Sequence, residues 1–434
     1  MRFLPWLQAA LLLASICQLS AANWPAWRGP HGTGVCEERS LPLNWSTNEN
    51  VRWRVPLPER GNSTPVIWGD RVFVTQAVDA EHRRVLMCFE KGSGKLLWKS
   101  GVTYADKELT HETNPYCSAS AVTDGERVIA SYGSAGLYAY DFSGKELWHR
   151  DVGKQHHIWG NAASPVIHGD LCVLNVGPGE RQFLVALDKK TSEEKWRIEE
   201  PGGHSGEVKP GQNQRDVWIG SWTTPIVISE GSAKSLVMTW PKRAAAYDPL
   251  TGKEKWTCSG LNPLVYTSAL HAGGVIVAMG GFNGMSLAVK TGGSGDVTET
   301  HRLWHHPKTK QRIGSGVIAG DYIYILNDPG VAECFELKTG KLVWEERLKG
   351  PAKSDSWSSM VLAGDRIYVG NQGGDTFVLE ASPTFKTLAT NSLREPIFSS
   401  VAVSDGNLFL RTHKALWCVG VSAPGSNPTR ASTR

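Results

Sequence analysis

A segment that ends in tryptophan recurs along this chain and restricts its fold more than any other feature. Five clear copies read VLMCFEKGSGKLLW, LYAYDFSGKELW, FLVALDKKTSEEKW, RAAAYDPLTGKEKW and AECFELKTGKLVW, and they end at Trp98, Trp148, Trp196, Trp256 and Trp344. A looser copy ends at Trp304, and Trp53 precedes them all. Successive tryptophans are 40 to 60 residues apart, which is the length of a four-stranded propeller blade.

Each copy also has an upstream half in which two β-rich runs are joined by Gly-Asp or Asp-Gly, as in STPVIWGDRVFVTQA. This arrangement is typical of a β-hairpin. A composition of 46 Gly, 18 Trp and only 6 Met favours turns and strands over helices. We therefore predict an all-β protein of eight four-stranded antiparallel blades, with a seven-bladed ring as the alternative. The eight upstream halves begin near Ser63, Ser118, Ala163, Thr223, Thr267, Gly314, Ser358 and Ser399.

The last copy ends at Val421 after three strands, so its fourth strand has to come from elsewhere. Residues 51–57 alternate apolar and polar side chains, contain a tryptophan that matches the repeat, and have no inner strand of their own. We expect them to pair with the strand around Leu416 to Val419 and to complete blade eight. This closure removes the open sheet edges that a linear array would leave. Residues 51–421 are thus predicted to form one eight-bladed β-propeller.

Both ends of the chain differ from the propeller in composition. A charged start, an apolar stretch and a small-residue end at Ala22 are the succession of a secretory signal peptide. We predict a signal peptide over residues 1–22 and a periplasmic or secreted protein; a membrane anchor is weaker because polar residues interrupt a short segment. Residues 422–434 are expected to be a disordered tail. Residues 23–50 are expected to pack on the propeller surface as an N-terminal arm through Trp24, Trp27 and Trp45.

The charge of the chain and the spacing of its cysteines argue against two kinds of binding site, one for nucleic acid and one for zinc. The chain has 46 Lys and Arg against 42 Asp and Glu, a net charge of +4 with no basic run, so nothing indicates nucleic-acid binding. We expect a monomer with no membrane span. No C-x-x-C and no adjacent cysteines occur, which argues against a zinc site. Cys88, Cys334 and Cys418 occupy a repeat position held elsewhere by alanine, so they are expected to be buried, unpaired thiols.

The form A-x-D-x-x-T-G-K-x-x-W, seen in AYDPLTGKEKW and AYDFSGKELW, resembles the pyrroloquinoline-quinone (PQQ)-like repeat family over about residues 51–421. That family includes quinoprotein dehydrogenases, the propeller subunit of the barrel-assembly machinery, and secreted propellers of unassigned role. The opening WPAWRGPHGTG and the segment THETNPYCS resemble the last group most. In the dehydrogenases the resemblance would imply a vicinal disulfide over the quinone and a calcium held by Glu, Asn and Asp, yet no cysteines are adjacent here.

The long loops of the chain all join a fourth strand to the next first strand, and such loops open on one face of a propeller. Because loops on a rigid scaffold carry function, we expect a ligand pocket at the channel mouth, with aromatic walls and His or Asn as orienting groups. The alternative is that the tryptophans cap the inner strands and the histidines are solvated. The candidate ligand-binding residues are His111, Asn114, Tyr116, His156, His157, Trp159, Asn161, Trp218, Trp222 and Trp357.

No catalytic triad, phosphate loop or acid pair is visible, so no catalytic or metal-binding residue is predicted. We expect an exported, non-catalytic scaffold that binds a protein, peptide or glycan partner without a cofactor. The alternative is a PQQ-dependent oxidoreductase with quinone and a divalent metal such as calcium in the channel. It would require His111, Asn114 or Asn161 to replace the family's calcium ligands.

Overall fold

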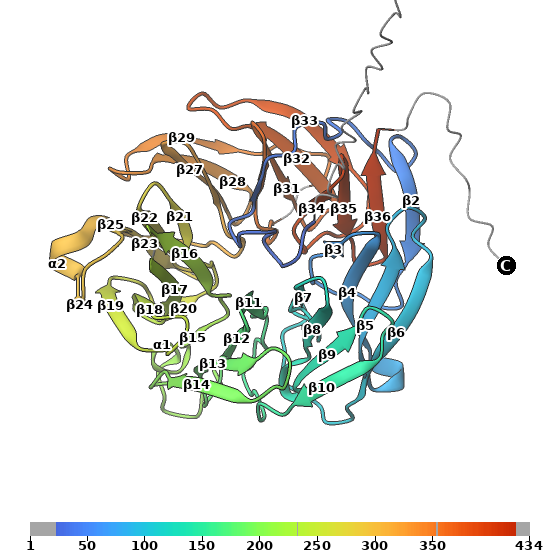
Figure 1. Cartoon of the computed structure of the whole chain (residues 1–434). Coiled ribbons are helices and arrows are strands. Elements are labelled where there is room, and N and C mark those ends of the chain that lie inside the picture. Colours follow the sequence, from blue (N-terminus) through green and yellow to red (C-terminus); the bar gives the residue numbers. More distant parts are fainter. Residues whose placement is uncertain (1–22, 232, 353–354, 422–434) are drawn as a thin grey trace, which may run out of the picture.

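The computed structural model describes residues 23–231, 233–352 and 355–421; the predicted signal peptide and C-terminal tail lie outside these ranges. Eight antiparallel blades surround a central channel, as predicted (Figure 1). The first strands are β3 (Val66–Trp68), β7 (Val122–Thr123), β11 (Val166–His168), β16 (Ile226–Glu230), β21 (Leu270–Ala272), β26 (Val317–Ala319), β30 (Val361–Ala363) and β34 (Ala402–Ser404). The second strands are β4 (Arg71–Val78), β8 (Arg127–Ser131), β12 (Leu171–Val176), β17 (Ala233–Trp240), β22 (Val275–Met279), β27 (Tyr322–Asn327), β31 (Arg366–Gly370) and β35 (Asn407–Arg411).

The outer half of each blade holds a third and a fourth strand. The third strands are β5 (Arg83–Glu90), β9 (Leu137–Asp141), β13 (Phe183–Asp188), β18 (Arg243–Tyr247), β23 (Gly284–Lys290), β28 (Val331–Glu336), β32 (Asp375–Glu380) and β36 (Ala415–Gly420). The fourth strands are β6 (Leu96–Thr103), β10 (Glu146–Arg150), β14 (Glu194–Glu199), β19 (Glu254–Ser259), β25 (Arg302–Lys310), β29 (Leu342–Arg347), β33 (Thr387–Ser392) and β2 (Val51–Pro56). The remaining elements are β1 (Val35–Cys36), β15 (Gly220–Ser221), β20 (Leu264–Val265), β24 (Gly295–Asp296), α1 (Gln214–Val217) and α2 (Thr298–His301).

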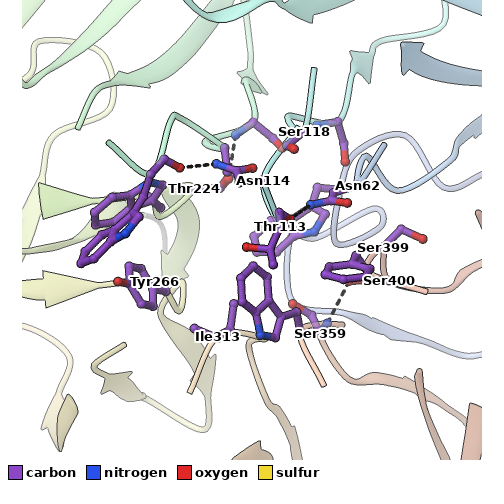
Figure 2. A pocket seen from close by; sticks show the side chains of 18 of the residues that line it. Asn62, Thr113, Asn114, Ser118, Thr224, Tyr266, Ile313, Ser359, Ser399 and Ser400 are labelled. Carbon is purple, nitrogen blue, oxygen red and sulfur yellow. Dashed lines mark hydrogen bonds between the residues drawn. The ribbon is translucent and has the colours of Figure 1, made fainter. Parts of the chain in front are cut away.

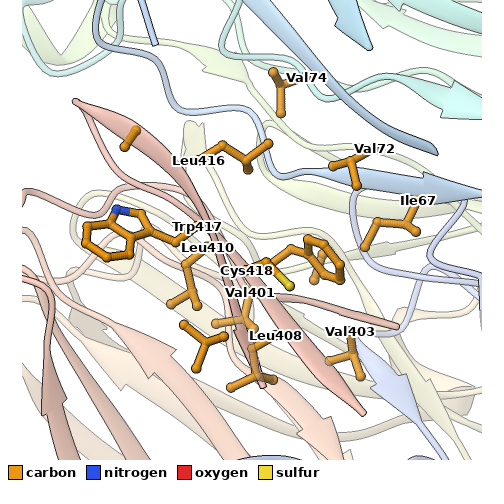
Figure 3. Close-up of a cluster of buried hydrophobic side chains, with 14 of the residues drawn as sticks. Ile67, Val72, Val74, Val401, Val403, Leu408, Leu410, Leu416, Trp417 and Cys418 are labelled. Atoms are coloured by element: carbon orange, nitrogen blue, oxygen red, sulfur yellow. The ribbon is translucent and has the colours of Figure 1, made fainter. Parts of the chain in front are cut away.

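Strand β2 closes the ring as the sequence predicted. It pairs antiparallel with β36, with Trp53 opposite Cys418 and Val55 opposite Leu416. Buried side chains of blades eight and one meet at this junction, among them Ile67, Val72 and Leu408 (Figure 3). The N-terminal end of the propeller is thereby fixed to its C-terminal end through apolar packing as well as backbone hydrogen bonds.

At six of the eight blade junctions a repeat tryptophan holds one blade to the next, and we call these residues the rim tryptophans. Each indole N–H donates to a carbonyl in the last turn of the following blade, as Trp98 Nε1 does to Phe142 O at 2.9 Å. The turn glycine lies against the indole: a Cβ on Gly94 would come within 2.7 Å of the Trp53 ring, and on Gly144 within 2.7 Å of Trp98. The glycine of the repeat is therefore required by close approach as well as by its positive φ. The rim tryptophans are Trp53, Trp98, Trp148, Trp196, Trp304 and Trp344.

The junction between blades four and five departs from this pattern. Strand β24, from the loop that precedes β25, pairs parallel with β19 and places Gly295 opposite Trp256. The Trp256 indole N–H is buried and donates no hydrogen bond to the described residues. The long insertion before Trp304 thus replaces the usual indole contact, which explains why that copy of the repeat is the loosest.

A ring of hydroxyl groups joins all eight blades around the channel, and we call it the hydroxyl belt. Each member lies two residues before a first strand. Its backbone N–H donates to the hydroxyl oxygen of the next member, over distances of 2.8 to 3.1 Å, and Ser400 closes the ring by donating to Thr64. Buried backbone N–H groups need such partners. The belt is Thr64, Ser120, Ser164, Thr224, Ser268, Ser315, Ser359 and Ser400.

The N-terminal arm does not lie only on the propeller surface, which corrects the prediction. Trp24 is fully buried and pairs with Ile67 of β3, and the carbonyl of Pro25 accepts from Thr123 of β7 in blade two, while β1 pairs parallel with β30 in blade seven. Between them the Arg28 guanidinium donates to the carbonyls of Gly316 and Ser315. The inner edges of first strands leave backbone groups unpaired, and the arm crosses the channel because it supplies partners for them. Figure 1 shows this blue segment passing over the centre of the ring.

The cysteines follow the expected register. Cys88, Cys334 and Cys418 each lie opposite a rim tryptophan, as Ala139 does in blade two. All three are buried, and the seven cysteines of the described residues are free thiols. Burial raises the pKa of the Cys88 thiol to about 12, so this group stays protonated and packs as a small apolar side chain.

Candidate functional site

A cavity of about 320 Å³ opens at the channel mouth on the side of the hydroxyl belt. Its walls come mainly from the loops that enter the first strands, with Trp27 of the arm and Phe282 between β22 and β23 as additional members (Figure 2). Aromatic side chains dominate the wall, and the remainder are small or neutral polar groups. The aromatic members are Trp27, Trp159, Trp222, Tyr266, Phe282, Trp357 and Phe398.

Five aromatic rings on blades three to five form a continuous surface, which we call the aromatic wall: Trp159, Trp218, Trp222, Tyr266 and Phe282. Trp159 lies 4.6 Å from Trp218 and 5.8 Å from Trp222 between ring centroids. Tyr266 lies 4.8 Å from Trp222, and Phe282 lies 6.2 Å from Trp218. Across the cavity Trp357 packs on Phe398 at 5.7 Å. The cavity is therefore bounded by aromatic rings on two sides.

Hydrogen bonds fix this wall in place before any ligand arrives. Trp222 Nε1 donates to Gly160 O at 2.8 Å, and Trp218 Nε1 donates to Gly206 O at 3.2 Å. Asn114 Nδ2 donates to Trp159 O at 2.7 Å and to Asn161 O at 3.2 Å, so it ties the loop of blade two to that of blade three. Such preorganisation lowers the entropic cost of binding.

Apart from His111, the polar side chains of the cavity are neutral hydroxyl and amide groups. Asn62 Nδ2 donates to Thr113 O at 2.8 Å, and Gln311 Nε2 donates to Asp328 Oδ2 at 2.7 Å. Asn114 Oδ1 and Gln311 Oε1 accept no hydrogen bond from the described residues. None of the described residues that line the cavity is Lys, Arg, Asp or Glu. The site therefore offers aromatic faces and neutral hydrogen-bonding groups.

The structure brings part of the predicted set to the cavity. His111, Asn114, Trp159, Trp222 and Trp357 line it. Trp218 supports Trp159 from behind, through the ring contact described above. Apart from Trp357, the predicted residues came from the loops of blades two to four, whereas the cavity is lined by residues from the whole ring.

Four predicted residues lie elsewhere. Tyr116 points to the blade body, where its hydroxyl donates to Glu108 O at 2.6 Å, and His156 is exposed and pairs with Glu207. Asn161 contributes its backbone carbonyl to Asn114. His157 is buried behind Trp222, at 4.9 Å between centroids, and burial lowers its pKa to about 3. His157 therefore fits neither expectation, since its ring is buried and supports the wall, and it is neither solvated nor placed to face a ligand.

Sequence reasoning missed several lining groups, among them Trp27, Tyr266, Phe282, Gln311 and Phe398. Tyr266 and Phe398 precede a belt serine by two residues, so their distance from the first strand would have been a usable signal. The belt itself was also readable as a Ser or Thr at a constant distance from each inner strand. Trp27 was assigned to the surface, and nothing in its local sequence places it in the channel.

A pair of carboxyl groups lies behind Gln311 and Trp357, on the side of the cavity away from the aromatic wall, and was not foreseen. Burial and the nearby Asp355 raise the pKa of Asp328 to about 6. Gln311 links Asp328 to the cavity through the hydrogen bond given above. Within the described ranges no group of three or more His, Cys, Asp or Glu is placed to hold a metal ion.

A second cavity of about 350 Å³ lies on the other side of Trp27. It differs in charge, because Arg28 and Lys234 contribute to its lining. Burial lowers the pKa of Arg28 to about 9, and backbone carbonyls surround its guanidinium. The arm thus divides the channel into a neutral chamber at the mouth and a basic chamber beyond it.

Residues 43–214 and 243–383 match the sequence model of a family described as outer membrane protein assembly factor BamB. The chain belongs to this family of PQQ-like propellers. No curated protein matches the chain in sequence. Among the helices that the structure describes, none is long and apolar enough to cross a membrane.

Solved structures of this propeller type resemble the chain in fold. BamB from Moraxella catarrhalis has 13% identity and a TM-score of 0.61, over 87% of this chain and 99% of that one. The quinohemoprotein alcohol dehydrogenase from Comamonas testosteroni has 12% identity and a TM-score of 0.66, over 94% and 82%. The designed protein Ika8 has 11% identity and a TM-score of 0.56, over 84% and 98%. At such identities the likeness concerns the fold, and function has to be argued from the site.

Proposed function

We propose that this protein is an exported, non-catalytic propeller that binds a ligand or partner group in the mouth cavity. The observation that carries the proposal is the preorganised aromatic cavity without a charged side chain among its described lining residues. Largely apolar, preformed concavities with a few convergent polar groups are the usual form of ligand sites. Export is supported by the predicted signal peptide and by the family's description as an outer-membrane assembly factor.

The residues of the cavity do not fit pyrroloquinoline quinone. That cofactor carries three carboxylates, and burying them without a cationic partner is costly. The described lining residues include no Lys or Arg to pair with these carboxylates, and no Asp or Glu to hold calcium beside them. The described part of the chain also has no adjacent cysteines. We therefore derive no reaction step through a quinone.

The proposal is tested with one anionic probe and one neutral probe. The protein is incubated with PQQ and calcium and desalted, and retained quinone absorbance and dye-linked alcohol oxidation are measured. A second sample is titrated with the neutral fluorophore N-phenyl-naphthylamine. We expect no retained quinone, no oxidation and saturable binding of the fluorophore. Stoichiometric retention of quinone with turnover would contradict the proposal, and so would failure of the fluorophore to saturate.

A further inference from the structure

We propose that the mouth cavity binds a neutral sugar ring, either as a free saccharide or as the end of a glycan. This inference rests on the proposed function and specifies the chemistry of its ligand. It is carried by three features that occur together: aromatic faces, unfilled hydrogen-bonding groups of both kinds, and the absence of Lys, Arg, Asp and Glu from the described lining. Each of these features excludes a different class of ligand.

The lack of charge excludes strongly ionic ligands. A phosphate, a carboxylate or an ammonium group entering this cavity would lose its hydration without meeting an opposite charge. Arg28 and Lys234 line the second cavity beyond Trp27, where backbone carbonyls already surround the Arg28 guanidinium. The mouth cavity therefore favours a ligand whose polar groups are neutral.

The hydroxyl belt supplies donors to such a ligand. Five of its members line the cavity, and in each the oxygen accepts the N–H of the preceding blade. None of these hydroxyls donates to a described residue, so each retains a proton for a ligand. Figure 2 shows Thr224, Ser359 and Ser400 around the same space. The five members are Ser120, Ser164, Thr224, Ser359 and Ser400.

Other polar atoms of the cavity are also unfilled. Tyr266 makes ring contacts with Trp222, but its hydroxyl forms no hydrogen bond with the described residues, and burial raises the pKa of its phenol above the ordinary value. The buried Trp357 indole N–H interacts with the Asp328 carboxyl group and is therefore not counted among the unfilled groups. Asn114 Oδ1 and Gln311 Oε1 remain as acceptors. An apolar peptide side chain or a lipid tail would leave all of these groups unpaired, at a cost for each buried one.

A sugar ring matches both the aromatic faces and the neutral hydrogen-bonding groups of the cavity. Its C–H faces pack against aromatic rings, and its hydroxyl groups both donate and accept hydrogen bonds around the ring edge. The aromatic wall and the Trp357–Phe398 pair stand on different sides of the space, while the belt lies at its inner end. A volume of about 320 Å³ lies at the lower end of the range for ligand pockets. It suits one or two sugar rings, and the open mouth allows a longer glycan to extend outward.

Calorimetric titrations of the full mature protein test this inference. The neutral probes are glucose, galactose, mannose and N-acetylglucosamine as methyl glycosides, together with a neutral oligosaccharide of each hexose. Glucuronate and glucosamine serve as charged counterparts of similar shape. We expect at least one neutral saccharide to bind with Kd below about 10 mM and its charged counterpart to bind at least about tenfold more weakly. Tighter binding of the oligosaccharide than of its monosaccharide would identify a glycan end as the source, and equal binding a free sugar.

Two variants separate the sugar inference from the proposed function. Tyr266→Phe removes one unfilled hydroxyl and keeps the aromatic wall, so it should weaken saccharide binding by about three- to tenfold and leave fluorophore binding unchanged. Tyr104→Phe, outside the cavity, is the matched control and should change neither. If no neutral saccharide binds while the fluorophore still saturates, the sugar inference is wrong and the proposed function stands. If neither binds, both are wrong.

Discussion

Tryptophans occupy two regions of this propeller and serve different purposes there. The rim tryptophans recur at one position of the repeat and donate to the next blade, and four of them pack on its turn glycine. The mouth tryptophans, Trp159, Trp222 and Trp357, come from loops that vary in length and sequence between blades, and they border a cavity. Trp222 and Trp357 both stand two residues before a belt hydroxyl, a position at which the residue type changes from blade to blade. The same side chain thus stabilises the ring where the residue type is repeated and forms a site where it varies.

The largest expected effect follows from removing a rim tryptophan at the closing junction. Trp53 is 8% exposed, and its indole N–H donates to Lys91 O at 2.8 Å. Trp53→Ala should lower the free energy of unfolding by about 3–5 kcal/mol, the usual cost of such a truncation. Urea unfolding followed by circular dichroism measures it. A loss below about 1 kcal/mol would show that the rim contact does not hold the ring closed.

The turn glycines test the same contact from the opposite blade. Gly94 has φ +74°, and a Cβ there would come within 2.7 Å of Trp53. Gly94→Ala should therefore cost about 2–4 kcal/mol in unfolding free energy. Gly69 has φ +57° but no heavy atom within 4 Å of the added Cβ, so Gly69→Ala should cost about 1 kcal/mol from backbone strain alone. Equal losses would mean that the indole contact is unimportant and that only φ matters.

The hydroxyl belt lies between the two regions and contributes to both. Ser164→Ala removes the acceptor of the buried Ser120 N–H, which donates to it at 3.0 Å. The unpaired N–H should cost about 1–3 kcal/mol of stability. Ser143→Ala, in an exposed turn, is the control and should stay within about 0.5 kcal/mol of the parent. Thermal unfolding of the two variants measures both losses. Equal losses would show that the belt hydrogen bond does not contribute to stability.

The buried Asp328 carboxyl group behind the mouth cavity should have the opposite effect to a rim tryptophan. It should lower the stability of the folded state at neutral pH. The pKa of Asp328 is raised to about 6 by burial and by Asp355, so the folded state holds its proton more tightly than the unfolded state. Its contribution to stability is present below the unfolded pKa and is lost as pH rises through about 6.

The measurement is the difference in unfolding free energy between Asp328→Asn and the parent as a function of pH. Relative to the parent, the variant should gain about 1–2 kcal/mol between pH 4 and pH 7. Carboxylates with a lowered pKa, such as Glu194, make the protein more stable as pH rises. Because the variant and the parent share these groups, their contribution cancels in the difference. A difference that does not change with pH would show that Asp328 titrates normally.

The periodic part of the molecule was predictable because each repeat residue is determined by its immediate surroundings in a turn or a strand. The turn glycine, the rim indole and the alternation of residues 51–57 are enough to assign blade number, register and closure. The cavity is different, since it exists only after eight loops have been brought round a ring. Trp159 and Trp222 were found because their loops are long and aromatic. Gln311 and Phe398 were missed because their loops are short.

The two clear errors have a common physical origin. Trp27 was expected on the surface and His157 at the mouth. The observed positions of both residues depend on where the closed ring leaves unpaired backbone edges and buried space. The arm enters the channel because the inner strands leave hydrogen-bonding groups to satisfy. His157 is withdrawn from the mouth because Trp222 covers it, with the two rings 4.9 Å apart. Neither fact is contained in the residues near these positions.

The most direct test of the account is to measure stability and binding together in Trp53→Ala and Trp159→Ala. Unfolding by urea and titration with N-phenyl-naphthylamine are performed on both variants and the parent, under conditions in which all three are folded. We predict that Trp53→Ala loses about 3–5 kcal/mol but retains the fluorophore, and that Trp159→Ala loses at most about 1 kcal/mol but binds it at least about tenfold more weakly. The account would be contradicted if Trp159→Ala lost stability comparable to Trp53→Ala while its fluorophore binding remained intact.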